Sequence, residues 1–221
     1  MQFARLARFT LLGVMACALL LPLSGSGSRA VAQSGANAAP QVRIYMMRGL
    51  LGVFSLGIDT LADRLRAQGY DPRIYAWDQW GSIASDILAR NRAGETGQII
   101  LIGHSLGSDS TIQVASAVRQ ANIPIDLIVT FDITQPLRVP SNVQRFINYY
   151  QDNGFGKVAQ PGYGFTGELV NVDLTADHTV THTNIDKNPR LQELVVEKVF
   201  DVAFQQTKKT PARQRKRQAG S

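Results

Sequence analysis

The residues Gly103-His104-Ser105-Leu106-Gly107 form a G-x-S-x-G pattern between the apolar run 99–102 and a helix-forming segment, 109–120. In that context the pattern holds a serine on a sharp turn from strand to helix, where only glycine lets the backbone segments pass closely. The amides at the start of the helix favour negative charge at the same point. We therefore expect Ser105 to be an oxygen nucleophile for acyl transfer.

A serine hydroxyl is a weak nucleophile, so it needs a histidine base and an acid that orients the base. The sequence contains three histidines, His104, His178 and His182. His104 adjoins the nucleophile with its side chain pointing away, and we interpret it as a packing or hydrogen-bonding residue. His182 lies nearer to the final predicted helix, the usual position of the base, and is preferred over His178.

Three aspartates follow predicted strands and are candidates for the acid. Asp132 ends the apolar run 127–131, so it emerges at the same sheet edge as the nucleophile, because parallel strands share their carboxyl ends. Asp152 and Asp173 follow weaker strand candidates and stay open as alternatives. We rank Asp132 first.

The negative charge of a tetrahedral intermediate needs backbone donors. The amide of Leu106 directly follows the nucleophile, and the amide of Leu50 lies in the turn after the first strong strand, where Gly49 lets the chain bend. Arg48, in the same turn, either braces it by pairing with an acid such as Asp78 or faces the substrate, and we prefer the bracing role.

Strand and helix signals alternate through residues 41–206, which predicts one α/β domain: a mostly parallel sheet with helices on both faces. The predicted strands are 41–47, 72–76, 99–102, 126–131, 146–150 and 169–174. The predicted helices are 58–67, 83–92, 109–120 and 189–206. Pro189 suits a first helical turn, and Asp186 is near enough to cap it or to favour the positive end of the helix.

Residues 1–32 are typical of a secretory signal peptide, with a basic start, an apolar run and the small residues Ala30-Val31-Ala32 before the predicted cleavage site. We expect an exported protein, periplasmic or secreted, with a linker at 33–40 and a disordered basic tail at 207–221. The one cysteine, Cys17, lies in the signal peptide, so the mature protein is expected to have no thiol nucleophile and no disulfide.

The net charge of +6 is unevenly distributed. Residues 33–207 carry 14 Lys and Arg against 17 Asp and Glu, a net charge of −3, so basicity does not indicate nucleic-acid binding. We find no zinc-ligand spacing and no phosphate-binding loop, and expect neither metal nor cofactor. The basic tail is either a weak contact to anionic surfaces or simply solvated.

The chain resembles the small, lidless α/β-hydrolases, notably the minimal bacterial lipases and esterases. The similarity runs through residues 44–49, the segment ending at 68–70, residues 77–78 and the turn at Ser105. It covers about two-thirds of the domain. The resemblance implies a single-domain α/β-hydrolase fold.

The resemblance further implies a Ser105, His182 and Asp132 triad acting on a small-molecule or lipid ester. Arg48 replaces the histidine found in many lipases, and Ser108 replaces a second glycine, which leaves the substrate class open. The same residues would serve a thioesterase or an acyltransferase. A non-catalytic binding protein of this fold is the other alternative, and oligomeric state stays open.

The longest stretch without a strong element is 151–167, a glycine-rich loop near the presumed active edge. Its aromatic residues Phe155, Tyr163 and Phe165 either contact an acyl chain or anchor the loop. The loop is too short for a lid, so we expect activity on short or medium acyl esters.

Overall fold

The computed structural model describes residues 42–50, 52, 55–152 and 154–218, with the backbone alone from 205 onward. The predicted signal peptide and linker lie outside these residues. Within the described part of the chain, no helix is both long and apolar enough to cross a membrane.

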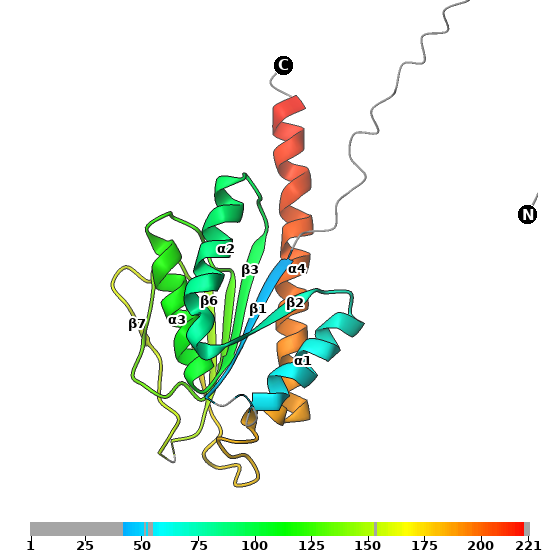
Figure 1. The fold of residues 1–221 in the computed structure, drawn as a ribbon. Helices are drawn as coiled ribbons and strands as arrows, with labels where there is room; N and C mark the ends of the chain where they lie inside the picture. The colour runs from blue at the N-terminus through cyan, green and yellow to red at the C-terminus, as the bar shows by residue number, and fades with distance from the viewer. Residues whose placement is uncertain (1–41, 51, 53–54, 153, 219–221) are drawn as a thin grey trace, which may run out of the picture. The chain divides into compact units, whose positions relative to one another are not determined.

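The core of the fold is a six-stranded sheet with the order β2-β1-β3-β4-β6-β8, in which every pair of neighbours is parallel (Figure 1). Its strands are β1 (Val42–Arg48), β2 (Pro72–Ala76), β3 (Gln98–His104), β4 (Leu127–Phe131), β6 (Arg145–Tyr150) and β8 (Glu168–Asp173). All six predicted strands are present. A separate pair, β5 (Arg138–Val139) and β7 (Gln160–Pro161), lies outside this sheet, and β7 falls in the stretch for which no strand was predicted.

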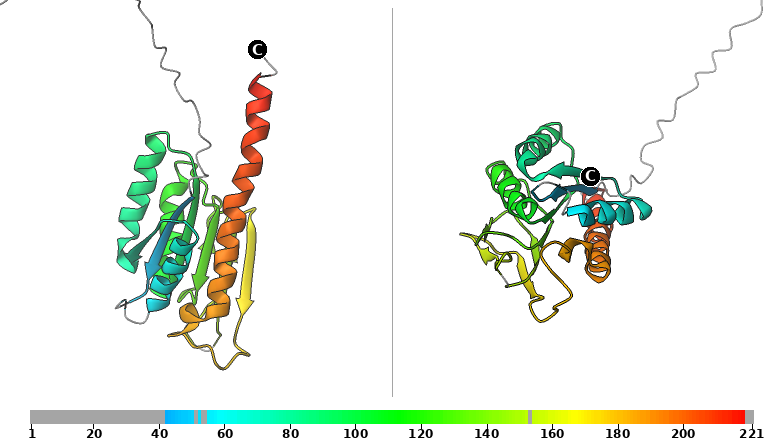
Figure 2. Two further views of the ribbon diagram at one scale, coloured as in Figure 1. Left: turned by 90° about the vertical axis from the view of Figure 1, so that its right-hand side faces the viewer. Right: turned by 60° about the horizontal axis from the view of Figure 1, so that its bottom comes forward.

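Helices cover both faces of the sheet (Figure 2). Helices α1 (Leu56–Ala67) and α4 (Pro189–Gln218) pack on one face, and α2 (Trp80–Arg92) and α3 (Leu106–Arg119) pack on the other. Strand β1 serves both cores by alternation: Ile44 and Met46 join the first, and Tyr45 and Met47 the second. Because both faces are buried, the central strands are mostly apolar, with a few buried polar side chains such as Thr130 and Asn148. The predicted α/β fold class is confirmed.

The helix boundaries differ from the prediction at several ends. Helices α1 and α2 each begin two or three residues earlier than expected. Helix α4 continues to Gln218, so helical backbone occupies most of the segment expected to be disordered. That segment is rich in Lys, Arg and Gln, which are good helix formers, although it also contains Pro211. Its start is capped by Asn188, whose Oδ1 accepts from the amides of Arg190 (3.0 Å) and Leu191 (3.2 Å), and not by Asp186 as predicted.

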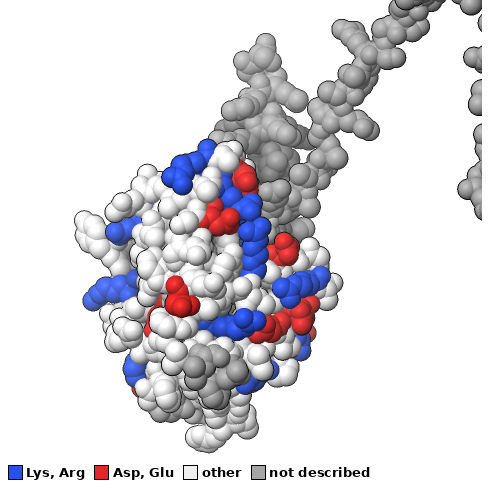
Figure 3. All heavy atoms as spheres, viewed as in Figure 1, with Lys and Arg blue, Asp and Glu red and all other residues white. Residues whose placement is uncertain are grey.

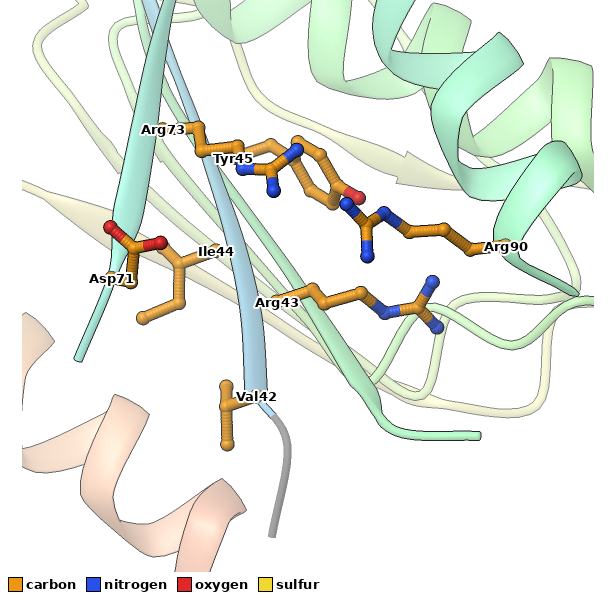
Figure 4. A pocket seen from close by; sticks show the side chains of 7 residues that line it. All are labelled: Val42, Arg43, Ile44, Tyr45, Asp71, Arg73 and Arg90. Carbon is orange, nitrogen blue, oxygen red and sulfur yellow. The ribbon is translucent and has the colours of Figure 1, made fainter. Parts of the chain in front are cut away.

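Charged residues join β1, β2 and α2 near the amino ends of the strands. Figure 4 shows Arg43, Arg73 and Arg90 gathered around the ring of Tyr45. The Tyr45 hydroxyl donates to Asp86 Oδ2 at 2.6 Å, and Arg90 Nε donates to the same oxygen at 3.0 Å. Burial, then the bond to Asp86, raises the pKa of Tyr45, so its hydroxyl stays a donor. Basic and acidic side chains are likewise interspersed on the face seen in Figure 3.

We expect Tyr45→Phe to lower the free energy of unfolding by about 1–2 kcal/mol, because a half-buried carboxylate loses its neutral donor while the ring's packing is kept. Urea denaturation at pH 7 measures the change. Tyr163→Phe is the matched control, since Tyr163 is 99% exposed and should change stability by less than about 0.5 kcal/mol. Equal stability of wild type and Tyr45→Phe would mean that the arginines satisfy Asp86 without the hydroxyl.

Candidate active site

Ser105 lies on a strained turn between β3 and α3. Its backbone adopts φ 56° and ψ −127°, a conformation that residues other than glycine rarely adopt. Here it directs the hydroxyl away from the edge of the sheet. A Cβ on Gly103 would lie 2.3 Å from the Gly107 carbonyl oxygen, and one on Gly107 would lie 2.3 Å from that of Met47. Both glycines of the pattern are therefore required by close backbone contacts, as the sequence indicated.

Ser108 fastens this turn to the neighbouring strand. Its hydroxyl lies 2.8 Å from the Gly103 carbonyl oxygen and 3.0 Å from that of Phe131. The Ser105 amide also donates to the Phe131 carbonyl, at 2.9 Å. The serine that replaces a second glycine is thus a buried link between β3 and β4.

Ser105, His182 and Asp132 form a continuous chain of hydrogen bonds. Ser105 Oγ lies 3.0 Å from His182 Nε2, and His182 Nδ1 lies 3.1 Å from Asp132 Oδ2. A carboxylate only accepts, so the neutral ring carries its proton on Nδ1 and presents the Nε2 lone pair to the serine hydroxyl. Ser105 directly follows β3, Asp132 directly follows β4, and His182 lies in the loop before α4; all three meet at the carboxyl edge of the sheet.

Asp132 is completely buried and is held by its surroundings. Its Oδ1 accepts from the backbone amide of Gln151 at 2.8 Å. The side-chain amide of Gln151 donates to carbonyl oxygens of the loop that carries the histidine, most closely to Val180 at 2.7 Å. A Cβ on Gly156 would lie 2.5 Å from Asp132 Oδ1, so the chain closes tightly over the carboxylate. Gln151 thereby links the acid to the base loop.

The other candidates lie away from this chain of contacts. Asp173 Oδ1 accepts from the Thr175 amide at 2.8 Å, so its carboxylate stabilises its own turn. Asp152 and His178 are exposed. Of the alternatives that the sequence left open, the structure brings Asp132 and His182 to Ser105.

The turn after β1 passes directly beside the nucleophile. A Cβ on Gly49 would lie 2.9 Å from Ser105 Cβ. Leu50 and Leu106, the two predicted backbone donors, line the same cavity as Ser105. Arg48 pairs with Asp59 on α1, its Nε donating to Oδ2 at 2.8 Å, and not with Asp78. The turn is braced as expected but by a nearer acid, because α1 follows the turn immediately.

An apolar cavity of about 390 Å³ opens at the Ser105 hydroxyl. Phe155, from the loop between β6 and β8, forms part of its wall and stacks on His182 with ring centroids 4.5 Å apart. Phe165 of the same loop packs against the core, and Tyr163 is exposed. The loop aromatics thus divide: one faces the cavity and one anchors the loop. No described residue that lines the cavity is Asp, Glu, Lys or Arg.

A second set of buried polar groups lies directly behind the first. His104 Nδ1 lies 2.7 Å from Ser55 Oγ, and His104 Nε2 lies 2.7 Å from the carbonyl oxygen of His182. Ser55 Oγ also accepts from the Gly49 amide at 2.8 Å. Burial lowers the pKa of His104 to about 4, so the ring is neutral at pH 7. The sequence predicted a hydrogen-bonding role for His104 but gave no indication of Ser55.

Asp186 is a completely buried acid at the edge of this set. Its Oδ2 lies 3.9 Å from His104 Nδ1, too far for a hydrogen bond, and the described residues give neither carboxyl oxygen a hydrogen bond of ordinary geometry. Burial raises the pKa of Asp186 to about 6, although Lys187 and the amide of Gly57 partly offset it. Within the described chain, no cluster of three or more His, Cys, Asp or Glu side chains is arranged to hold a metal ion.

Sequence reasoning missed Gln151 and Ser55 for the same reason. Neither belongs to a pattern, and each acts through contacts with segments distant in sequence. Gln151 follows β6 directly, so its place at the carboxyl edge was the one available signal.

No family model matches this sequence, and no curated protein sequence matches it. Several solved structures are similar. A protein assigned as a YdeN-like hydrolase from Pectobacterium atrosepticum is 15% identical, with a TM-score of 0.43 over 73% of this chain and 92% of that chain. RedJ, a thioesterase of prodiginine biosynthesis in Streptomyces coelicolor, is 12% identical, with a TM-score of 0.45 over 83% and 97%.

A third similar structure, assigned as a hydrolase of the α/β superfamily, comes from Xanthomonas campestris pv. campestris. It is 16% identical, with a TM-score of 0.38 over 70% of this chain and 98% of that chain. Likeness at this level says nothing about substrate or activity. The chemistry of the present site must be inferred from its own geometry.

We expect Asp186→Asn to change how stability depends on pH. The folded-state pKa of Asp186 is raised from 3.8 to about 6, so its contribution is present at low pH and is lost as pH rises through this interval. The variant should match wild type most closely near pH 4. It should gain about 1–3 kcal/mol relative to wild type by pH 7, at about 1.4 kcal/mol per pKa unit.

Urea denaturation of both proteins from pH 4 to pH 7 measures this difference. Asp63→Asn, on the exposed side of α1, controls for the loss of one negative charge. A stability difference that does not vary with pH would show that Asp186 is not perturbed.

Proposed function

We propose that this protein is a serine hydrolase that cleaves carboxylic esters through an acyl-enzyme. The observation that carries the proposal is the hydrogen-bonded chain from Ser105 through His182 to Asp132, which opens on an apolar cavity. The strained backbone of Ser105 supports the same conclusion, because such strain is kept where function requires it.

In this mechanism Ser105 Oγ attacks the ester carbonyl carbon while His182 Nε2 takes the hydroxyl proton. The amides of Leu50 and Leu106 stabilise the tetrahedral oxyanion. The intermediate collapses when the C–O bond to the alcohol breaks, and His182 returns the proton to the leaving alkoxide. Water, deprotonated by His182, then attacks the acyl-enzyme and releases the acid. Asp132 keeps the imidazole in the Nδ1–H tautomer throughout.

The lining of the cavity favours an ester substrate with an apolar, uncharged acyl group. Leu50, Leu106 and Phe155 supply apolar wall, and the described lining contains no cation that would bind an acyl carboxylate. The stacking of Phe155 on His182 covers one face of the imidazole. Shielding from water strengthens the hydrogen bonds of the triad.

A fluorophosphonate probe tests the mechanism. Mass spectrometry should locate one adduct on Ser105, with no adduct in Ser105→Ala. We expect labelling and p-nitrophenyl butyrate turnover to fall by about 10³-fold or more in His182→Ala and about 10²- to 10⁴-fold in Asp132→Asn. Ser116→Ala, an exposed serine on α3, should behave as wild type. A folded wild-type protein that is neither labelled nor active would favour a non-catalytic binding protein.

Phe155→Ala tests the acyl site. In wild type, kcat/KM should rise about fourfold for each methylene from p-nitrophenyl acetate to butyrate, the equivalent of about 0.8 kcal/mol per buried CH₂. We expect Phe155→Ala to reduce this gain, because one wall of the cavity is removed. Tyr163→Ala, in the same loop but exposed, is the control. If the dependence of kcat/KM on acyl-chain length is unchanged in Phe155→Ala, the acyl group binds elsewhere. If the protein turns over a thioester faster than the matching oxygen ester, it is a thioesterase.

A further inference from the structure

The two loops on which the proposed chemistry depends are joined by hydrogen bonds that do not involve Ser105. At one end the Gly49 amide donates to Ser55 Oγ at 2.8 Å, in the turn that carries the Leu50 amide. At the other end His104 Nε2 contacts the carbonyl oxygen of the base itself, His182, at 2.7 Å. Ser55 and His104 meet in the middle at 2.7 Å, and both are about 1% exposed.

The donor and acceptor properties of these groups fix the direction of every hydrogen bond in this series. A carbonyl oxygen only accepts, so His104 Nε2 carries the proton that it donates to the His182 carbonyl. In a neutral ring Nδ1 is then an acceptor, and the Ser55 hydroxyl must donate to it. Ser55 Oγ in turn accepts from the Gly49 amide. Each of the three donors, the Gly49 amide, the Ser55 hydroxyl and His104 Nε2–H, therefore has one acceptor.

We propose that Ser55 and His104 are positioning residues that hold the oxyanion turn and the base loop at fixed places on either side of Ser105. This inference rests on the proposed hydrolase function and extends it to two almost fully buried residues at the wall of the same cavity. They act through the Leu50 amide and the His182 ring.

The close packing at the site explains why such a link would matter. The turn has almost no clearance from the nucleophile, since a Cβ on Gly49 would lie 2.9 Å from Ser105 Cβ. A small shift of the turn moves the Leu50 amide away from a developing oxyanion, and a small shift of the loop moves His182 Nε2 away from the hydroxyl. Misplacement by about 1 Å costs on the order of 10²-fold in rate.

The bonds also distinguish positioning from mere filling of the core. A buried histidine with only a packing role would also need a hydrogen-bond partner for each ring nitrogen, but those partners would not have to lie in the active-site loops. Here both nitrogens reach the two active-site loops, and the His104 and His182 rings lie 5.1 Å apart. His104 is the last residue of β3, so it directly precedes the strained turn at Ser105.

A set of matched variants tests the inference in the full-length mature protein. Ser55→Ala removes the acceptor of the Gly49 amide, His104→Leu removes both ring contacts, and the double variant removes the whole link. His104→Gln keeps a side-chain donor of similar reach as the conservative replacement. The controls are Ser116→Ala and His178→Leu, at exposed positions. Urea denaturation identifies conditions in which every variant is folded.

We expect Ser55→Ala and His104→Leu each to lower kcat for p-nitrophenyl butyrate by about tenfold or more with KM changed little, because the lost alignment acts in the transition state. The double variant should be about as slow as the slower single variant, since both changes break one link. His104→Gln should recover part of the loss. Single effects that multiply in the double variant, or folded variants with wild-type kcat, would overturn the inference.

Nitrogen-15 NMR of the histidine rings gives a readout that needs no activity. His104 should be the neutral Nε2–H tautomer at pH 7 in wild type, and the Nδ1–H tautomer would overturn the direction of the chain. The two proposals fail in different ways. A wild-type protein that is not labelled by the phosphonate contradicts the hydrolase function, whereas a labelled wild type with unaffected variants contradicts only the positioning role.

Discussion

The close crossing of α3 over the end of β1 is the constraint on which the rest of the site depends. Gly107 approaches the Met47 carbonyl so closely that no side chain fits between them, and Gly103 meets Gly107 in the same way. This crossing leaves Ser105 as the residue that must turn outward, in a backbone conformation that it would not otherwise adopt. The strain is local, and the buried sheet and helix on either side hold it in place.

The same crowding accounts for the many polar groups that are buried near the nucleophile. A loop that must stay within hydrogen-bond reach of Ser105 needs fixed attachments, and Gln151 and His104 supply some of those that hold the base loop. Gln151 holds it at the Val180 carbonyl, and His104 holds it at the His182 carbonyl. Because an unsatisfied buried polar group is costly, each of these attachments resists displacement. Asp186 differs from them: the described residues give neither of its carboxyl oxygens a hydrogen bond of ordinary geometry, and burial raises its pKa to about 6.

The two ends of the sheet are built in different ways. At the carboxyl ends of the strands, the described residues that line the apolar cavity at the triad are all neutral. Toward the amino ends, arginines gather around Tyr45 (Figure 4), and Asp86 contacts Tyr45, Arg73 and Arg90, which ties β1, β2 and α2 together. Stability and the proposed chemistry are thereby supported by separate sets of residues, joined through the rigid strands between them.

The sequence by itself determined the fold class and the nucleophile candidate, because both follow from short-range patterns. Alternating strand and helix signals predict a parallel sheet. The two glycines around Ser105 identify the sharp turn without any knowledge of its place in the fold. Chain order and strand placement narrowed the acid to three aspartates, with Asp132 ranked first, and the base to two histidines, with His182 preferred, but left the alternatives open. The partners of Arg48 and the cap of α4 were predicted wrongly, since several polar residues stood at comparable distances along the chain.

Only the tertiary structure decided which of these groups meet. Asp132 reaches His182 because β4 lies beside β3 in the sheet and the base loop folds back over their ends, a placement that depends on strand order and on packing of α4. Ser55 and Gln151 entered the site in the same way, through partners more than twenty residues distant. Such contacts depend on how helices and strands pack against one another, and short sequence patterns do not predict this packing.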